Sequence, residues 1–327
     1  MDKAQMLERM DPQLRGGYMA LEPFSIQYEA LCAFRRDALA AYRQAPADLK
    51  GRDDIRFSMK TIPSHYGGDP LQLRIYEPTK RASIMPVILF FHGGGCILSS
   101  AEQEDPACIE MALEENAVVV SADYRLAPEY PAPAGQMDCC TAWMWVCGEG
   151  RALLGLDLDR SVIYGGSAGG HMVMGVALRL LDEKKRLPSA ILPLYPMLDN
   201  RGMTRSSQEI TDGSLWGRDQ NLQAWDYYIN GLSGGTGIEA DSYIVPAKRD
   251  DFHGLPPVFT FVGELDQFRD ETIDLVRKLS YCDVPVTFAL YPGCYHAFEL
   301  YVPDADVSKQ ARRSLHEFIQ KIFQAKP

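Results

Sequence analysis

The sequence predicts an α/β fold in which a mostly parallel β-sheet is flanked by helices. Apolar runs of strand length alternate with stretches of helical periodicity from residue 87 onward, as expected of parallel strands joined by helices. The run Val87-Ile88-Leu89-Phe90-Phe91 is apolar without alternation, which indicates a central strand covered on both faces. A chain of 327 residues fits one large domain, and two are not required.

The expected elements follow in order along the chain. Apolar residues at helical spacing between residues 25 and 42 predict an amphipathic helix, either a lid over the sheet or an ordinary packing helix. Residues 55–62 and 71–76 flank a turn and predict an antiparallel hairpin at a sheet edge. The other expected strands are 87–91, 117–121, 161–164, 190–194, 258–262 and 286–290, and the other expected helices are 102–116, 135–147, 171–181, 220–229, 272–281 and 307–323.

Composition restricts the classes of partner. The net charge of −11 argues against nucleic acid or an anionic membrane as partner and leads us to expect a small neutral substrate. The eight cysteines form no C-x-x-C pair or zinc pattern, so we expect mostly buried thiols, no metal and a reducing compartment. The start lacks an apolar leader and no long apolar run occurs, so we expect a cytoplasmic protein without stable membrane insertion.

The glycine-rich stretch around Ser167 carries the first chemical signal. The sequence Gly165-Gly166-Ser167-Ala168-Gly169 fits G-x-S-x-G, the nucleophile elbow. A side chain at either outer glycine is expected to clash, and the turn is expected to present the Ser167 hydroxyl at its tip. An ordinary strand-to-helix loop is the alternative, but an expected strand before the motif and a helix after it favour the elbow.

A serine nucleophile needs a base, and His296 is the best candidate among six histidines. It follows the last expected strand, where a loop at the carboxyl edge of the sheet brings it beside Ser167. His65, His253 and His316 are expected at the surface. His171 lies one helical turn beyond the serine and is expected to be a core or supporting residue.

The carboxylate that orients this base is expected just after the strand 258–262. Asp266 is best placed, with Glu264 and Asp270 as alternatives, although Asp270 and Glu271 also suit the start of the next helix. The order Ser, Asp, His is that of α/β-hydrolases. The expected oxyanion donors are the backbone amides of Gly94, Gly95 and Ala168, and His92 is expected to brace their loop. This chemistry requires no metal or cofactor.

The segment from residue 199 to residue 257 is long for a single connection. Insertions of this length on a rigid sheet commonly build binding surface. Its aromatic residues either line a pocket or pack the insertion onto the domain; they are Trp216, Trp225, Tyr227 and Tyr228.

Taken together, these motifs resemble the hormone-sensitive-lipase-like esterases of the α/β-hydrolase superfamily. The resemblance runs from Pro86 to the C-terminus. It rests on His92-Gly93-Gly94-Gly95, Asp123-Tyr124-Arg125-Leu126-Ala127-Pro128-Glu129, the elbow through Gly170, Asp266 and His296.

The resemblance implies an α/β-hydrolase fold with an eight-stranded sheet and a helical cap. Residues 1–50 would form the cap segment and residues 51–327 the catalytic domain, with an insertion at about 199–250 contributing to the cap. The implied activity is hydrolysis of short-acyl (acetyl-like) carboxylic esters. Its implied residues are Ser167 as nucleophile, His296 as base, Asp266 as its partner, and Gly94, Gly95 and Ala168 as oxyanion donors. A homodimer through the last strand is also implied.

Three positions depart from the family pattern and concern the pocket. Gly166 stands where the family usually has Asp, Cys96 where it has an aromatic residue, and His171 where Asn is common. From Cys96 we expect that thiol reagents inhibit by crowding the pocket. A ligand receptor that lacks the histidine base is the main competing function, and His296 weighs against it; an amidase or long-chain lipase is a third possibility.

Overall fold

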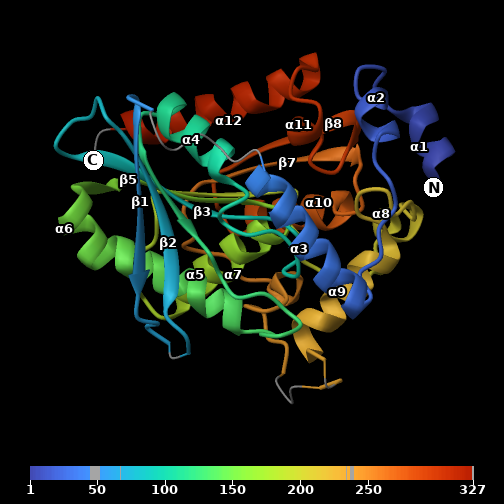
Figure 1. Cartoon of the computed structure of the whole chain (residues 1–327), viewed down its shortest axis with the longest axis horizontal. Coiled ribbons are helices and arrows are strands. Elements are labelled where there is room, and N and C mark those ends of the chain that lie inside the picture. Colours follow the sequence, from blue (N-terminus) through green and yellow to red (C-terminus); the bar gives the residue numbers. More distant parts are fainter. Residues whose placement is uncertain (45–51, 67, 233, 236–238, 326–327) are drawn as a thin grey trace.

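A single β-sheet forms the centre of the molecule (Figure 1). The structure is a computed structural model that describes all residues except 45–51, 67, 233, 236–238 and 326–327. The strands are β1 (Ile55–Ile62), β2 (Leu71–Pro78), β3 (Met85–Phe91), β4 (Val118–Ala122), β5 (Leu156–Gly166), β6 (Ala190–Leu194), β7 (Val258–Leu265) and β8 (Val286–Tyr295). Within the described residues their order is β1-β2-β4-β3-β5-β6-β7-β8.

The pairing confirms the expected topology. The β1–β2 hairpin is antiparallel and lies at one edge, and β2 is also antiparallel to β4. All other neighbouring strands are parallel. The carboxyl ends of β3, β5, β7 and β8 therefore meet at one edge of the sheet, where the expected site residues follow them.

Helices connect the strands and cover the sheet. They are α1 (Lys3–Arg9), α2 (Arg15–Met19), α3 (Tyr28–Gln44), α4 (Asp105–Glu114), α5 (Ala134–Trp145), α6 (Arg151–Leu154), α7 (Ala168–Asp182), α8 (Arg205–Glu209), α9 (Arg218–Asn230), α10 (Arg269–Tyr281), α11 (Phe298–Tyr301) and α12 (Asp306–Gln324). A π-helical turn covers Val146–Gly150 and a 3-10 turn covers Pro246–Lys248. Each longer helix expected from the sequence is present, with shifted ends.

Alternate residues of the central strand contact different helices. Leu89 packs in the cluster that contains the buried faces of α5, α7 and α10. Ile88 and Phe90 pack in the opposite cluster, with α4, α12 and the N-terminal helices α1 and α2. The apolar run of β3 is therefore buried on both sides, as its lack of alternation predicts.

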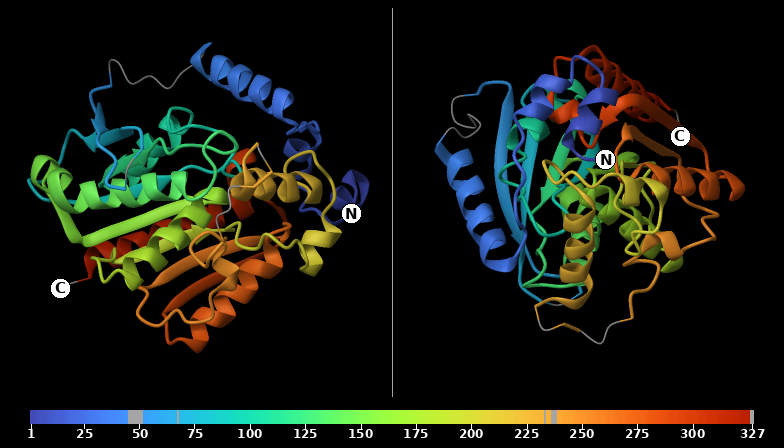
Figure 2. Two further views of the ribbon diagram at one scale, coloured as in Figure 1. Left: turned by 90° about the horizontal axis from the view of Figure 1, so that it is seen from below. Right: turned by 90° about the vertical axis from the view of Figure 1, so that its right-hand side faces the viewer.

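Helix α3 lies on the outside of this layered body (Figure 2). Two ion pairs hold it against the loops that follow β3 and β4. Arg35 contacts Glu129 at 2.8 Å, and Arg43 contacts Glu102 at 2.6 Å. This position sets α3 over the edge of the sheet at which the site forms.

Candidate active site

Ser167 occupies the sharp turn between β5 and α7, as the motif predicts. Its backbone has φ 58° and ψ −120°, a conformation that residues with side chains rarely adopt. The turn brings two backbones into close contact, since a Cβ atom on Gly169 would lie 2.1 Å from the carbonyl oxygen of Phe91. Glycine at this position is therefore a condition for the turn to form.

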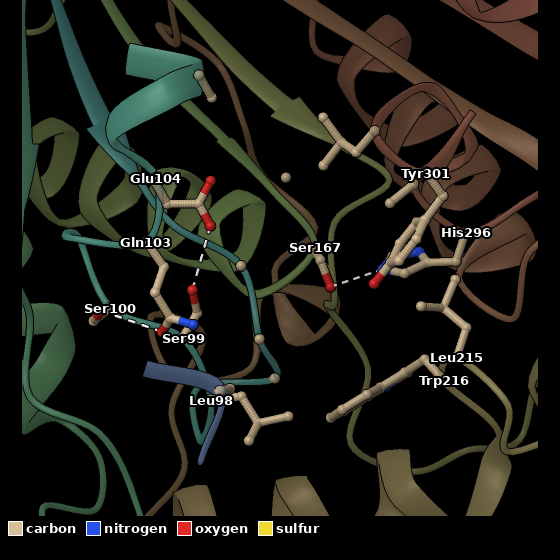
Figure 3. A pocket seen from close by; sticks show the side chains of 18 of the residues that line it. Leu98, Ser99, Ser100, Gln103, Glu104, Ser167, Leu215, Trp216, His296 and Tyr301 are labelled. Carbon is tan, nitrogen blue, oxygen red and sulfur yellow. Dashed lines mark hydrogen bonds between the residues drawn. The ribbon is translucent and has the colours of Figure 1, made fainter. Parts of the chain in front are cut away.

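The structure brings Ser167, His296 and Asp266 into one hydrogen-bonded chain. Ser167 Oγ lies 3.0 Å from Nε2 of His296 (Figure 3). Nδ1 of His296 lies 2.7 Å from Oδ2 of Asp266. The second oxygen of Asp266 accepts a hydrogen bond from the Phe268 amide at 2.9 Å. Each of the three residues directly follows a parallel strand or lies at its end. This geometry suits proton transfer from the serine hydroxyl to the imidazole.

The alternative carboxylates have other partners. Glu264 forms an ion pair with Arg9 at 2.6 Å. Asp270 accepts a hydrogen bond from the Ser206 amide at 2.7 Å. Among the candidates considered from the sequence, Asp266 is thus the one that contacts the imidazole.

The two buried histidines, His92 and His171, have structural surroundings. His171 is buried edge-on against Trp225 and Tyr228, at ring-centroid distances of 5.3 and 5.1 Å. Burial lowers the pKa of His171 to about 4, so the ring is neutral near pH 7. His92 stacks on Tyr124 at 4.2 Å, and its Nδ1 hydrogen-bonds the next carbonyl at 2.8 Å. These contacts match the core and bracing positions expected of the two residues.

A cavity of about 540 Å³ lies in front of Ser167. Gly94 and Gly95 line it, and Ala168 begins α7 immediately after the serine. In the described part of the chain, the amides of Gly94, Gly95 and Ala168 donate to no backbone carbonyl in a turn, loop or cap. They have the donor chemistry that an oxyanion requires.

The N-terminal region and the long insertion both contribute to this cavity. Phe24, Phe34 and Arg35 line it from the N-terminal side, and Leu215 and Trp216 line it from the segment between β6 and β7. Helix α3 therefore lines the pocket besides packing beside the sheet. The insertion's aromatic residues divide between the two expected positions, because Trp216 lines the pocket while Trp225 and Tyr228 pack in the core.

Comparison with known proteins gives the family. A family model described as alpha/beta hydrolase fold matches residues 88–300. The chain belongs to this family. It is 31% identical over 300 residues to carboxylesterase NlhH of Mycobacterium tuberculosis, covering 90% of this chain and 92% of the relative. It is 26% identical over 234 residues to ethyl acetate hydrolase of Pseudomonas putida, covering 71% and 72%.

A solved structure agrees with the sequence comparisons. The bacterial heroin esterase superposes with a TM-score of 0.89 at 30% identity, covering 98% of this chain and 99% of that one. The expected α/β-hydrolase fold and the hormone-sensitive-lipase-like family are confirmed. This member of the family is a carboxylic ester hydrolase.

The departure at Gly166 from the usual family residue has a steric explanation. A Cβ atom on Gly166 would lie 2.8 Å from the ring of Tyr195. The Tyr195 hydroxyl donates to the buried carboxyl group of Glu299, and its ring packs edge-on against His296 at 5.0 Å. Sequence reasoning missed Tyr195 and Glu299, because neither lies in a recognised motif.

Cys96 differs from its expectation. Its side chain is 1% exposed, and burial raises the pKa of its thiol well above the usual range. The thiol is therefore shielded from reagents in solution and has little thiolate character in the folded protein. The expected inhibition by crowding of the pocket has no support, because Cys96 packs in the core behind the glycine loop.

Two further expectations concern metals and membranes. In the described residues, the side chains of Asp251, His253 and Cys282 offer potential metal ligands within 4.8 Å of one another. They lie outside the pocket, and two of the three residues are exposed. The described helices include none that is long and apolar enough to cross a membrane.

Proposed function

We propose that this enzyme is a serine carboxylesterase that hydrolyses short-chain acyl esters. The observation that carries the proposal is the hydrogen-bonded chain from Ser167 through His296 to Asp266 at the wall of the pocket. Ser167 is 8% exposed and Asp266 is 1% exposed. A substrate thus meets the hydroxyl, while the carboxylate is shielded from water.

The proposed reaction proceeds through an acyl-enzyme. Ser167 Oγ attacks the ester carbonyl carbon while His296 accepts its proton, and Asp266 holds the imidazole in the required tautomer. The amides of Gly94, Gly95 and Ala168 stabilise the negative oxygen of the tetrahedral intermediate. His296 returns the proton to the leaving alcohol, and water then hydrolyses the acyl-enzyme by the same steps.

The preference for short acyl groups rests on two observations. Ethyl acetate hydrolase, by its name, acts on an acetyl ester. The Trp216 ring also packs closely on the glycine loop, where a Cβ atom on Gly95 would lie 2.3 Å from it. This contact narrows the space beside the proposed oxyanion donors.

We also propose the division into a cap segment of residues 1–50 and a catalytic domain of residues 51–327. Phe24, Phe34 and Arg35 support a cap position for the N-terminal segment, because they line the pocket. Leu215 and Trp216 support a contribution from the insertion at about 199–250. Residues 45–50, which end the proposed cap segment, and residue 51 lie outside the described residues.

Steady-state kinetics on p-nitrophenyl esters of increasing acyl length test this function. We expect acetate and butyrate esters to be hydrolysed faster than long-chain esters. Ser167→Ala and His296→Ala should each lower kcat by about 10⁴-fold or more, and the double variant should lose little beyond either single variant, because triad members act as one unit.

Matched substitutions serve as controls. His65→Ala removes an exposed histidine, and Glu264→Gln neutralises a nearby carboxylate bonded elsewhere. Both variants should retain kcat within about threefold, whereas Asp266→Asn should lose about 10⁴-fold. Wild-type protein that is folded but inert toward every ester, or a Ser167→Ala variant with full activity, would overturn the proposal.

A further inference from the structure

One pocket carboxylate has no part in the proposed reaction. Glu104 lines the cavity and immediately precedes α4, but its side chain makes no cap hydrogen bond to that helix. It accepts a hydrogen bond from Ser99 Oγ at 3.3 Å. In Figure 3, Glu104, Gln103, Ser99 and Ser100 group on one side of Ser167, while His296, Trp216 and Tyr301 lie on the other.

The charge of Glu104 is uncompensated within the described residues. Among the described residues, its carboxylate hydrogen-bonds Ser99 and takes part in no ion pair. Arg74 is already paired with the carboxylate of the neighbouring residue, because it contacts Asp105 at 2.6 Å. Arg35, the other charged residue of the pocket lining, contacts Glu129 at 2.8 Å.

Keeping the Glu104 carboxylate ionised costs free energy when the pocket is empty. Burial raises the pKa of Glu104, and the nearby Asp105 carboxylate raises it further. A carboxylate without a cationic partner in a largely apolar site is an expected feature of a ligand-binding position. A positive charge on the ligand would provide the missing partner.

Aromatic rings of the same pocket favour the same ligand chemistry. Tyr164 and Tyr301 line the cavity; burial is the main cause that raises the pKa of both phenols, and the negative charge of Glu104 adds to it. The Phe90 ring lies 5.4 Å from that of Tyr164 and also faces the cavity. Aromatic rings and a carboxylate that line one cavity are the surroundings in which ammonium groups bind.

We propose that Glu104 forms a subsite that selects esters carrying a cationic amino group, either a protonated amine or a quaternary ammonium. The proposal rests on the esterase function proposed above and names a substrate class for it. Glu104 is a specificity residue here and takes no part in bond cleavage.

The test compares cationic esters with neutral esters of the same shape. Acetylcholine and 3,3-dimethylbutyl acetate place the group on the alcohol side. The p-nitrophenyl esters of 4-trimethylammoniobutyrate and 5,5-dimethylhexanoate place it on the acyl side. The proteins are wild type, Glu104→Gln, which retains an acceptor for Ser99, and Glu110→Gln, which removes an exposed carboxylate from α4.

We expect wild type to favour the cationic member of at least one pair by about tenfold or more in kcat/KM. Glu104→Gln should abolish that preference while changing kcat/KM for the neutral ester by less than about threefold. Glu110→Gln should retain the preference. In wild type the preference should grow with rising pH as Glu104 loses its proton, and this trend should be absent in Glu104→Gln. A merely structural Glu104 would not produce this pH dependence.

Equal cationic-to-neutral ratios in wild type and Glu104→Gln for both pairs would overturn the subsite. Failure of the esterase function looks different, since wild type would then hydrolyse none of the four esters. In that case calorimetry, which compares the binding of choline with that of 3,3-dimethylbutanol, still tests the Glu104 subsite. Tighter binding of choline that is lost in Glu104→Gln supports the subsite, and equal binding of the two alcohols contradicts it.

Discussion

Tyr195 and Glu299 are individual residues outside the triad that support it, because the Tyr195 ring packs against His296 and its hydroxyl bonds Glu299. Glu299 is 4% exposed and accepts a hydrogen bond from the Tyr195 hydroxyl, while its Oε2 atom has no hydrogen-bond partner among the described residues. Burial raises the pKa of Glu299 to about 7 despite that bond and the proximity of His296. Replacing the neighbouring Gly166 by a larger residue would displace the Tyr195 ring and disturb this arrangement.

The raised pKa of Glu299 makes a prediction about stability and pH. Its carboxyl holds a proton more tightly in the folded protein than in the unfolded chain, so its contribution to stability is present below pH 4.5 and is lost as the pH rises through about 7. Glu299→Gln removes this dependence. The stability of the variant relative to wild type should therefore rise by about 3 kcal/mol or less between pH 4.5 and pH 8, measured by urea unfolding.

Glu264 provides a control of opposite sign. The Gly293 amide, which donates to its carboxylate, and Arg9 lower the pKa of Glu264. The contribution of the Glu264 carboxylate to the free energy of unfolding is lost as the pH falls. The variant Glu264→Gln should therefore be less stable than wild type by the largest amount near neutral pH. A relative stability of Glu299→Gln that does not change with pH would contradict the buried, protonated carboxyl.

For individual residues, the sequence predicts the contacts that follow from strand order and misses the contacts that depend on loop packing. Ser167, Asp266 and His296 each follow an apolar strand, so parallel topology alone places them together. Tyr195 and Glu299 are 104 positions apart, and Glu104 sits before an ordinary helix. Their proximity to the site depends on how loops pack, which periodicity does not encode.

Among the elements, the turn from β5 to α7 has the tightest backbone contacts. Both outer glycines of the motif lie against the backbone of Phe91. Gly169→Ala should lower the free energy of unfolding by about 3 kcal/mol or more, since the clash is with backbone that cannot move aside easily. Thermal unfolding followed by circular dichroism measures this effect.

Gly16 in α2 is the matched control. A Cβ atom there meets no atom of the described residues within 4 Å, and alanine suits a helix better than glycine. Gly16→Ala should therefore leave stability unchanged or raise it by about 0.5–1 kcal/mol. Equal unfolding temperatures for Gly169→Ala and wild type would contradict the described packing of the elbow.

The sequence predicts long elements well and short ones poorly. The apolar strands and helices such as α7 and α12 carry enough periodic residues to identify them. Helices α1, α2, α8 and α11 have seven residues or fewer, too few for a helical pattern to emerge. Long-range contacts fix them instead, as in the ion pair of Arg9 at the end of α1 with Glu264.

For the whole molecule, the sheet leaves β1 and β8 at its two edges. A homodimer through β8 stays a prediction. The net charge led to the expectation of a neutral substrate, whereas the Glu104 carboxylate, which forms no ion pair with a described residue, favours a cationic one. Overall charge describes the average surface, and pocket selectivity depends on local charges that only the fold assembles.

The central claim is that one serine, Ser167, is the nucleophile of this pocket. Reaction with diethyl p-nitrophenyl phosphate tests it directly, because attack on phosphorus releases p-nitrophenolate and leaves a stable phosphoserine ester. We predict one equivalent of p-nitrophenolate per chain, a diethylphosphoryl group located on Ser167 by peptide mass spectrometry, and no adduct in Ser167→Ala. An adduct on another residue, or equal labelling of Ser167→Ala, would contradict the account.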